Sequence, residues 1–196
     1  ENTAPSALER EISIKTPRSL YIGGEWVAPC EGGTIDVLSA HSEKTIATVA
    51  EATNADMDAA VLAARRAFDA GPWARLSPVE RSDHLMGLHA ALVPRVPELV
   101  KAWVDQVGSL ATVAPFVIGG GVSSLQYYAE LAKTYPFVSA QAPADGNGEA
   151  FIVREPVGVT VAVAPWNNPF GIMISKVAAA LAAGCTVIMK PAPETP

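Results

Sequence analysis

The sequence is poor in cysteine and in charged residues. It has two cysteines among 196 residues, and the spacing of Cys30 and Cys185 fits neither a zinc motif nor a disulfide framework. Cys30 follows a proline in a polar stretch and is predicted to be a plain surface thiol. Cys185 stands in an apolar run typical of a buried strand and is predicted to be inert packing. We therefore expect no metal site, and this cysteine usage fits a reducing, cytoplasmic location.

Basic residues are also scarce. Charged residues make up 17% of the chain, and its net charge is -6 at pH 7. Nucleic-acid binding needs clustered Lys and Arg, so nucleic acid is not an expected partner. No apolar run reaches the roughly 18 residues that cross a membrane, and residues 1–19 alternate in charge, unlike a signal peptide. We expect no membrane partner and a loose N-terminal arm over residues 1–19.

What the sequence does contain is a hydrophobic fraction of 49%, which excludes disorder of the whole chain. The first ordered elements are short strands. Gly23-Gly24 predicts a hairpin over residues 20–27. A second strand pair is expected at residues 34–38 and 45–49.

Helices are expected next, because capping residues precede apolar positions at helical spacing. Thr53 is predicted to cap one helix, and Ser77 opens a capping box for another. A third helix is expected over residues 98–107, closed by Gly108, and residues 109–132 are expected to be mostly helical. The predicted apolar faces of the first two helices are Met57, Val61, Ala64 and Phe68, and Leu85, Leu88 and Leu92.

Three consecutive glycines, Gly119, Gly120 and Gly121, allow two interpretations. They resemble the start of a phosphate loop, but Ser124 occupies the place of the last glycine in the Gly-x-Gly-x-x-Gly pattern, and no clear strand precedes them. A kinked helix or close helix packing is favoured.

Residues 133–156 have few helix formers, and Asp145-Gly146-Asn147-Gly148 is a strong turn signal between two extended stretches. This pattern predicts a long β-hairpin. An isolated two-stranded ribbon is marginally stable, so we expect it to pair with another chain or with a further part of this one.

Residues 157–190 predict a βαβ unit with parallel strands. A β-branched run at 157–164 is typical of a strand buried on both faces, residues 170–183 read as a buried helix, and 186–189 form a second strand. Ligands of open parallel sheets sit beyond the carboxyl ends of the strands. The turn at 165–168 and Lys190 follow those two ends and should share one rim of the sheet.

The residue types at this rim suggest roles. The Asn167 side chain can donate a hydrogen bond to an oxyanion, although taken alone it also fits an ordinary helix cap. Lys190 carries three donors suited to ribose hydroxyls or phosphate oxygens.

Several spaced motifs resemble the aldehyde dehydrogenase superfamily. They are Glu155–Val159, Ala164–Pro169 and Met189–Pro196, with Tyr21–Trp26 and Phe68–Trp73 nearer the N-terminus. The resemblance implies an α/β fold: a Rossmann-like parallel sheet of the nucleotide-binding domain with a protruding oligomerisation β-hairpin. Residues 20–132 would be the N-terminal part of the cofactor-binding domain, 133–156 the hairpin, and 157–196 the first βαβ unit.

The resemblance also implies a cofactor, a substrate and site residues. The cofactor would be NAD, with NADP as the alternative, and the substrate a small-molecule aldehyde. The implied cofactor-binding residues are Ala164, Pro165, Trp166, Asn167, Lys190, Ala192 and Pro193. Asn167 would stabilise the oxyanion, and Lys176 would lie near the active site. The implied aldehyde-tunnel residues are Asn168, Ile172 and Ser175, which are polar or small where bulky aromatics are common, so a wider or more polar tunnel is expected.

The sequence departs from the family pattern at two places. The glutamate that many members use to bind the ribose hydroxyls falls on Pro193, and Glu194 comes one residue later. The family's nucleophilic cysteine and general base lie beyond residue 196, so the chain is expected to be incomplete and inactive alone. The complete enzyme would be a homo-oligomer, a dimer or tetramer. The alternatives are a non-catalytic nucleotide-binding or interaction fragment, and a semialdehyde or acyl-phosphate reductase.

Overall fold

The computed structural model describes residues 14–196, and its first elements are two antiparallel hairpins. Strand β1 (Leu20–Ile22) pairs with β2 (Glu25–Val27), and β3 (Thr34–Leu38) pairs with β4 (Thr45–Ala50). Both predicted strand pairs are confirmed. Of the predicted N-terminal arm, residues 1–13 lie outside the described part of the chain.

Four helices follow, and three of their ends are formed by predicted capping residues. They are α1 (Asn54–Ala70), α2 (Pro78–Leu92), α3 (Val96–Val107) and α4 (Ala114–Thr134), with 3-10 turns at Trp73–Arg75 (η1) and Val93–Arg95 (η2). Thr53 and Ser77 each complete a capping box, and Gly108 takes the left-handed conformation that ends α3. Helix α4 begins five residues later than residue 109, where helix was expected, because residues 111–113 form a turn.

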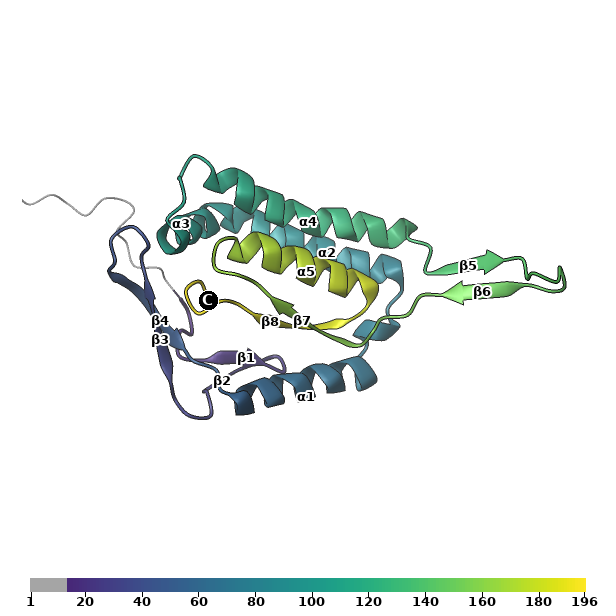
Figure 1. Cartoon of the computed structure of the whole chain (residues 1–196), viewed down its shortest axis with the longest axis horizontal. Helices are drawn as coiled ribbons and strands as arrows, with labels where there is room; N and C mark the ends of the chain where they lie inside the picture. Colours follow the sequence, from purple (N-terminus) through teal and green to yellow (C-terminus); the bar gives the residue numbers. More distant parts are fainter. Residues whose placement is uncertain (1–13) are drawn as a thin grey trace, which may run out of the picture.

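The predicted βαβ unit is confirmed. Strand β7 (Val159–Val163) and strand β8 (Thr186–Lys190) are parallel, and α5 (Pro169–Ala183) connects them. Figure 1 shows the two-stranded sheet between α5 and α1, with α2 and α4 packed on the outer side of α5. Buried small and branched residues fill the helical layer: Leu85, Leu125, Ala129, Ala132, Ile174, Ala178 and Ala182.

The prediction that the first strand of this unit is buried on both faces is wrong. Ala162 and Ala164 pack against Met173 of α5, but Val161 and Val163 are 46% and 53% exposed. Alternate residues of a strand point to opposite faces. One face of β7 therefore lies under α5, and the other remains largely open.

Two residues of the predicted helical faces are also wrongly placed. Val61 and Leu88 are exposed, whereas Leu85 is fully buried and Leu92 packs against the same cluster. Met57 and Ala64 of the predicted α1 face do line the inner side of the helix, with Ala60 in place of Val61. Apolar spacing alone could not fix the rotation of either helix.

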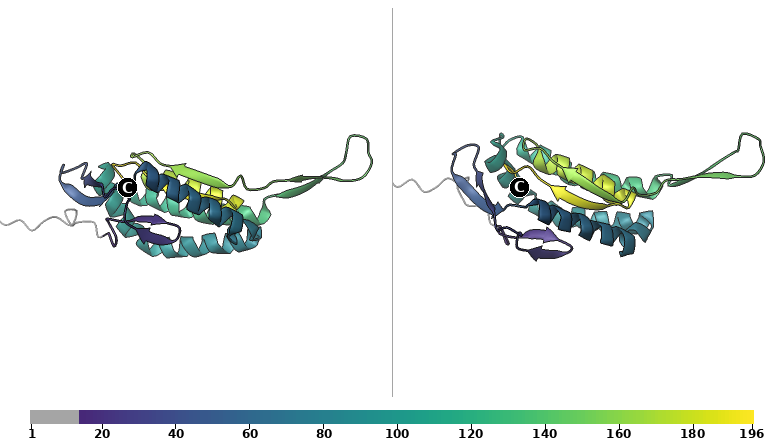
Figure 2. Two further views of the ribbon diagram at one scale, coloured as in Figure 1. Left: turned by 90° about the horizontal axis from the view of Figure 1, so that it is seen from below. Right: turned by 60° about the horizontal axis from the view of Figure 1, so that its bottom comes forward.

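The predicted hairpin consists of β5 (Val138–Gln141) and β6 (Ala150–Val153), and it projects from the body (Figures 1 and 2). Arginines hold its root. Arg154 donates to Pro136 O at 2.7 Å, and the guanidinium of the buried Arg81 lies over the Phe137 ring. Every residue of β6 is exposed.

The three consecutive glycines lie inside α4, so the phosphate-loop alternative is wrong and the helical interpretation is confirmed.

Asp56 fastens the start of α1 to the loop after β2. Its carboxylate accepts hydrogen bonds from Thr53 N at 2.8 Å and from Cys30 N at 3.0 Å. The hydrogen bond from Thr53 N, followed by the one from the Cys30 thiol, lowers the pKa of Asp56 to about 2. The same contact with Asp56 raises the pKa of the Cys30 thiol.

We predict that Asp56→Asn destabilises the protein at neutral pH. Because the folded-state pKa is depressed from 3.8 to about 2, this stabilisation is present above pH 3.8 and is lost as the pH falls towards 2. Urea unfolding at pH 7 and at pH 2.5 should show a difference from wild type that shrinks at the lower pH. Asp58→Asn, on an exposed side chain of the same helix, is the control.

Alkylation of Cys30 at pH 8 should be faster in Asp56→Asn, and an unchanged rate would contradict the proposed thiol contact.

Candidate functional site at the rim of the parallel sheet

The turn after β7 and the end of β8 lie at the same rim of the sheet, as predicted. The parallel register pairs Val163 with Lys190. Ala164 N, at the start of the turn, donates to Lys190 O at 3.2 Å. The turn that carries Asn167 therefore begins beside Lys190.

The side chains at this rim divide into buried and open ones. Ala164 is buried against α5, whereas Asn167 and Lys190 are exposed, and Trp166 is 55% exposed. Farther along, Ala192 is buried and Pro193 and Glu194 are exposed. The Asn167 amide, the Lys190 ammonium group and the Trp166 indole ring are thus all accessible to a ligand. Buried Ala164 packs the start of the turn against α5.

Helix α5 begins at this rim without a side-chain cap. Its N-cap residue is Asn168, whose side chain makes no capping hydrogen bond, and Pro169 occupies the first helical position. The cap interpretation of Asn167 is therefore excluded. The backbone N–H groups of Phe170 and Gly171 come too early in the helix to have an intrahelical acceptor. With the positive end of the helix dipole, they favour an anionic group at this point.

Asn168 is held by a contact that the sequence did not indicate. Its Oδ1 is buried and has no hydrogen-bond partner. A Cβ at Gly171 would lie 2.6 Å from this oxygen and 3.2 Å from Asn168 Cγ. The Asn168 side chain can adopt this position because Gly171 has no side chain. A glycine in the first turn of an otherwise Ala-rich helix was the available signal.

The other predicted residues of α5 are spread along the helix. Ile172 is half-buried against the β7 face, and Ser175 Oγ donates to Ile172 O at 3.0 Å. Lys176 is exposed, roughly 12 Å along the helix axis from Asn168. The structure thus brings Asn167, Asn168 and Lys190 to the rim and leaves Ser175 and Lys176 two turns away from it.

Neither cysteine lies in the two chain segments that form this rim. Cys30 is exposed beside Asp56, and Cys185 is 3% exposed at the opposite end of α5 from Asn167. Within residues 14–196, no group of three His, Cys, Asp or Glu side chains is placed to hold a metal ion. Among residues 14–196, none of the helices combines the length and hydrophobicity of a membrane-spanning segment.

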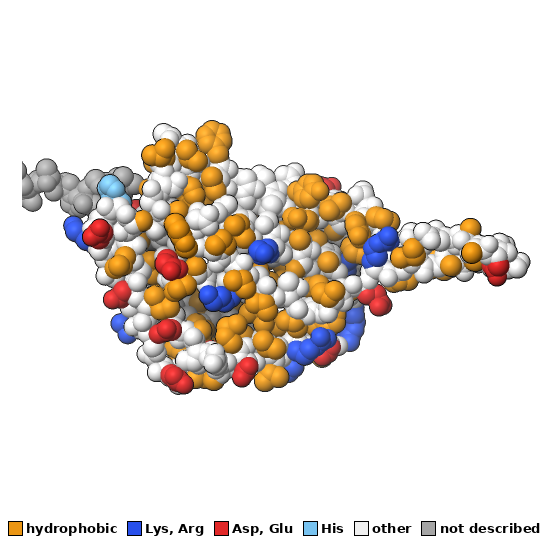
Figure 3. All heavy atoms as spheres, in the orientation of Figure 1, with side chains coloured by type: hydrophobic (Ala, Val, Ile, Leu, Met, Phe, Trp, Pro, Cys, Tyr) orange, Lys and Arg blue, Asp and Glu red, His pale blue; other side chains and the backbone are white. Residues whose placement is uncertain are grey.

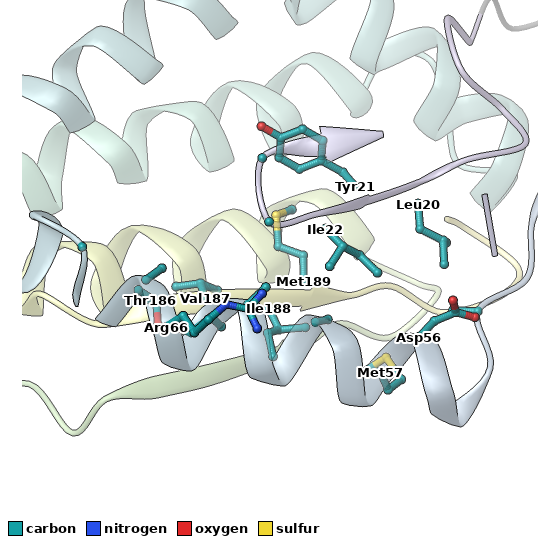
Figure 4. Close-up of a pocket in the computed structure, with 18 of the residues that line it drawn as sticks. Leu20, Tyr21, Ile22, Asp56, Met57, Arg66, Thr186, Val187, Ile188 and Met189 are labelled. Carbon is teal, nitrogen blue, oxygen red and sulfur yellow. Dashed lines mark hydrogen bonds between the residues drawn. The ribbon is translucent and has the colours of Figure 1, made fainter. Parts of the chain in front are cut away.

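A cavity of about 840 Å³ lies between β1, α1 and β8 and reaches Met189, the residue before Lys190 (Figure 4). Its walls are mostly apolar, with Ile22, Met57 and Ile188 among them. The Asp56 carboxylate at one end is already hydrogen-bonded to Thr53. None of the predicted site residues lines this cavity.

The family of the chain follows from comparison with known proteins. The family model described as aldehyde dehydrogenase family matches residues 26–196. The chain belongs to the aldehyde dehydrogenase family. The resemblance inferred from the motifs is confirmed over nearly the whole described chain.

Individual aldehyde dehydrogenases agree with this assignment. The chain is 38% identical over 178 residues to aldehyde dehydrogenase 1 of Tanacetum cinerariifolium, covering 90% of this chain and 35% of that protein. It is 38% identical over 177 residues to the geranial dehydrogenase of Castellaniella defragrans, covering 90% and 37%. The crystal structure of a mutant of aldehyde dehydrogenase C from Pseudomonas syringae, in complex with NAD+ and octanal, superposes with a TM-score of 0.87 at 32% identity, covering 96% and 38%.

The chain therefore spans little more than a third of the length of these aldehyde dehydrogenases. Because the solved structure exceeds 30% identity and superposes closely, the α/β fold and its βαβ unit are those of the family.

We predict that Gly171→Ala destabilises the protein. The new methyl group would overlap the Asn168 amide, and overpacking of this kind costs about 1–3 kcal/mol. Gly87→Ala in α2 is the matched control, because a Cβ there meets nothing within 4 Å and alanine improves helix propensity by up to about 1 kcal/mol. In urea unfolding, the free energy of unfolding of Gly87→Ala should equal or exceed that of wild type, and that of Gly171→Ala should be lower. If both variants gained the same free energy of unfolding, the Asn168 side chain would be moving aside without cost.

Proposed function

We propose that the complete protein containing this chain oxidises an aldehyde to a carboxylic acid with NAD+ as the hydride acceptor. The observation that carries this proposal is the shared rim, where exposed Lys190 ends β8 and exposed Asn167 lies in the turn after the neighbouring parallel strand β7. Support comes from the family assignment and from the solved aldehyde dehydrogenase that binds NAD+ and octanal.

The rim suits a dinucleotide. The uncapped start of α5 offers backbone N–H groups and a positive dipole end to an anion. Lys190 supplies an ammonium group for the adenosine ribose, and Ala192 and Pro193 would line the adenosine pocket. Ala164, Pro165 and Trp166 would lie against the nicotinamide, which accepts a hydride when bound. NADP remains the alternative, because Glu194 stands one residue after the position of the usual ribose-binding glutamate.

Asn167 would act on the aldehyde oxygen. Its exposed side-chain NH2 group can donate to the oxyanion that forms when a thiolate adds to the carbonyl carbon. That thiolate would come from outside residues 1–196, since Cys185 is buried at the opposite end of α5 and the contact with Asp56 raises the pKa of the Cys30 thiol. Lys176 would act at longer range, through groups that lie between it and the reacting atoms.

The aldehyde would approach past Asn168, Ile172 and Ser175. The Asn168 Oδ1 atom is buried and unpartnered, so a polar substrate group that reached it would satisfy it. The Ser175 hydroxyl is already bonded to Ile172 O. We therefore favour Asn168 as the residue that makes the tunnel more polar.

Assembly through the β5–β6 hairpin is part of the same proposal. Val138, Phe151 and Val153 are each about 60% exposed on a ribbon that leaves the body (Figures 2 and 3). A free ribbon with apolar side chains is marginally stable, and pairing with a second copy of the protein would cover it. A cytoplasmic location also remains a proposal, supported by the two free thiols.

We predict that Asn167→Ala lowers kcat of the complete enzyme by about a hundredfold or more, the size of effect expected for one oxyanion donor. The exposed position of Asn167 predicts little change in stability. Single-turnover measurement of NADH formation checks this, with Asn147→Ala in the hairpin turn as the exposed asparagine control. Unchanged turnover in Asn167→Ala would remove this residue from the mechanism.

We predict that Lys190→Ala raises the Kd for NAD+ about tenfold or more, because a hydrogen bond to a charged group contributes roughly 1.5–3 kcal/mol. Quenching of tryptophan fluorescence by NAD+ is a suitable measurement, since Trp166 is exposed at the same rim. Lys133→Ala, in an exposed ion pair on α4, serves as the control. Titration with NADP+ shows which cofactor depends more on the ammonium group. An equal Kd for NAD+ in Lys190→Ala and Lys133→Ala would contradict the assignment of Lys190 to the cofactor site.

A further inference from the structure

The middle of α4 comes unusually close to the first turn of α5. A Cβ at Gly121 would lie 3.0 Å from both Cδ1 and Cε1 of Phe170, and 3.2 Å from Cγ2 of Ile174. Such distances are shorter than ordinary van der Waals contact. The Phe170 ring therefore rests directly against the backbone of α4, and any side chain at Gly121 would push it away.

Phe170 is well placed to transmit such a push, because it is the second residue of α5 and lies three residues after Asn167. Its ring packs between two buried clusters. One contains Leu85, Leu125 and Ile174, and the other contains Trp103, Ala114 and Ile118. Since the ring is confined on both sides, a displaced Phe170 would carry the first turn of α5 with it.

The backbone of α4 is also constrained at this point. Ser124 Oγ donates to Gly121 O at 2.6 Å. This bond occupies the carbonyl of the residue that faces Phe170. Helix α4 is also packed against α2 and α3, so we expect a new contact at Gly121 to move the first turn of α5 rather than α4.

We propose that Gly121 is a positioning residue for the candidate catalytic turn: by having no side chain, it seats Phe170 against α4 and thereby fixes where Asn167 and Asn168 stand at the rim. This inference rests on the proposed function, because it takes Asn167 as the oxyanion donor. It also distinguishes Gly121 from Gly119 and Gly120 by its role. A Cβ at Gly119 or Gly120 meets nothing within 4 Å, so only the third glycine is required by packing.

The test compares Gly121→Ala with Gly120→Ala in the complete protein. Both changes replace a helical glycine by alanine one residue apart, so their effects on helix propensity are matched. A crystal structure of Gly121→Ala should show the first turn of α5 moved away from α4 by a few tenths of an ångström, with Asn167 displaced. The turn in Gly120→Ala should superpose on wild type.

Kinetics provide the second readout. A misplacement of about 1 Å can reduce a rate about a hundredfold, so we expect Gly121→Ala to lower kcat by about three- to tenfold. The Kd for NAD+ should change less, because Lys190 lies on β8 and not on α5. In the double variant Gly121→Ala/Phe170→Leu, the smaller side chain should restore most of the lost kcat. Gly120→Ala should keep the wild-type kcat.

The outcomes separate this inference from the proposed function. An unmoved α5 turn in Gly121→Ala overturns the positioning role, and so does a moved turn with an unchanged kcat. If the turn moves but the wild-type protein oxidises no aldehyde in the presence of NAD+ or NADP+, the proposed function fails and the packing role of Gly121 stands. A fall in kcat that Phe170→Leu does not rescue also counts against the role, because the effect would then not pass through the ring.

Discussion

The parallel pairing of β7 with β8 is the constraint on which the candidate site depends. Parallel strands end at the same edge of a sheet, so the pairing of Val163 with Lys190 brings the turn after one strand next to the last residue of the other. Helix α5 makes this possible because its 15 residues span about 22 Å, enough to return the chain to the start of the sheet. It lies between the sheet and the α2–α4 layer, which explains why its sequence is apolar nearly all round.

Local signals in the sequence predicted most of the elements and little of their burial. Thr53, Ser77 and Gly108 each satisfy backbone groups within a few residues, so their effects do not depend on distant parts of the chain. Burial depends on which element covers which face. Val61 and Val161 fit apolar patterns and are nevertheless exposed in the described residues, because the rotation of α1 and the placement of α5 decide their surroundings.

The same distinction holds at the site. The order of strand, turn, helix and strand was enough to predict that Asn167 and Lys190 share a rim. It could not show that Asn168, and not Asn167, is the first boundary residue of α5, or that the Asn168 carbonyl oxygen is buried without a partner. Those features arise from side-chain packing around Gly171 and from the contact between α4 and α5. The residues that make the latter contact lie about fifty positions apart in the sequence.

Glycine within a helix lowers stability, and here two helical glycines occupy positions near the rim where a side chain would make a close contact. Each helical glycine is about 1 kcal/mol less favourable than alanine. Alanine at Gly121 or Gly171 would gain that amount but would push on Phe170 or on Asn168. An oxyanion donor is effective only when its direction is set before the reaction begins. The two glycines therefore lower the stability of their helices but fix the position of the first turn of α5. The direction of the exposed Asn167 amide depends on the absence of a side chain at both positions.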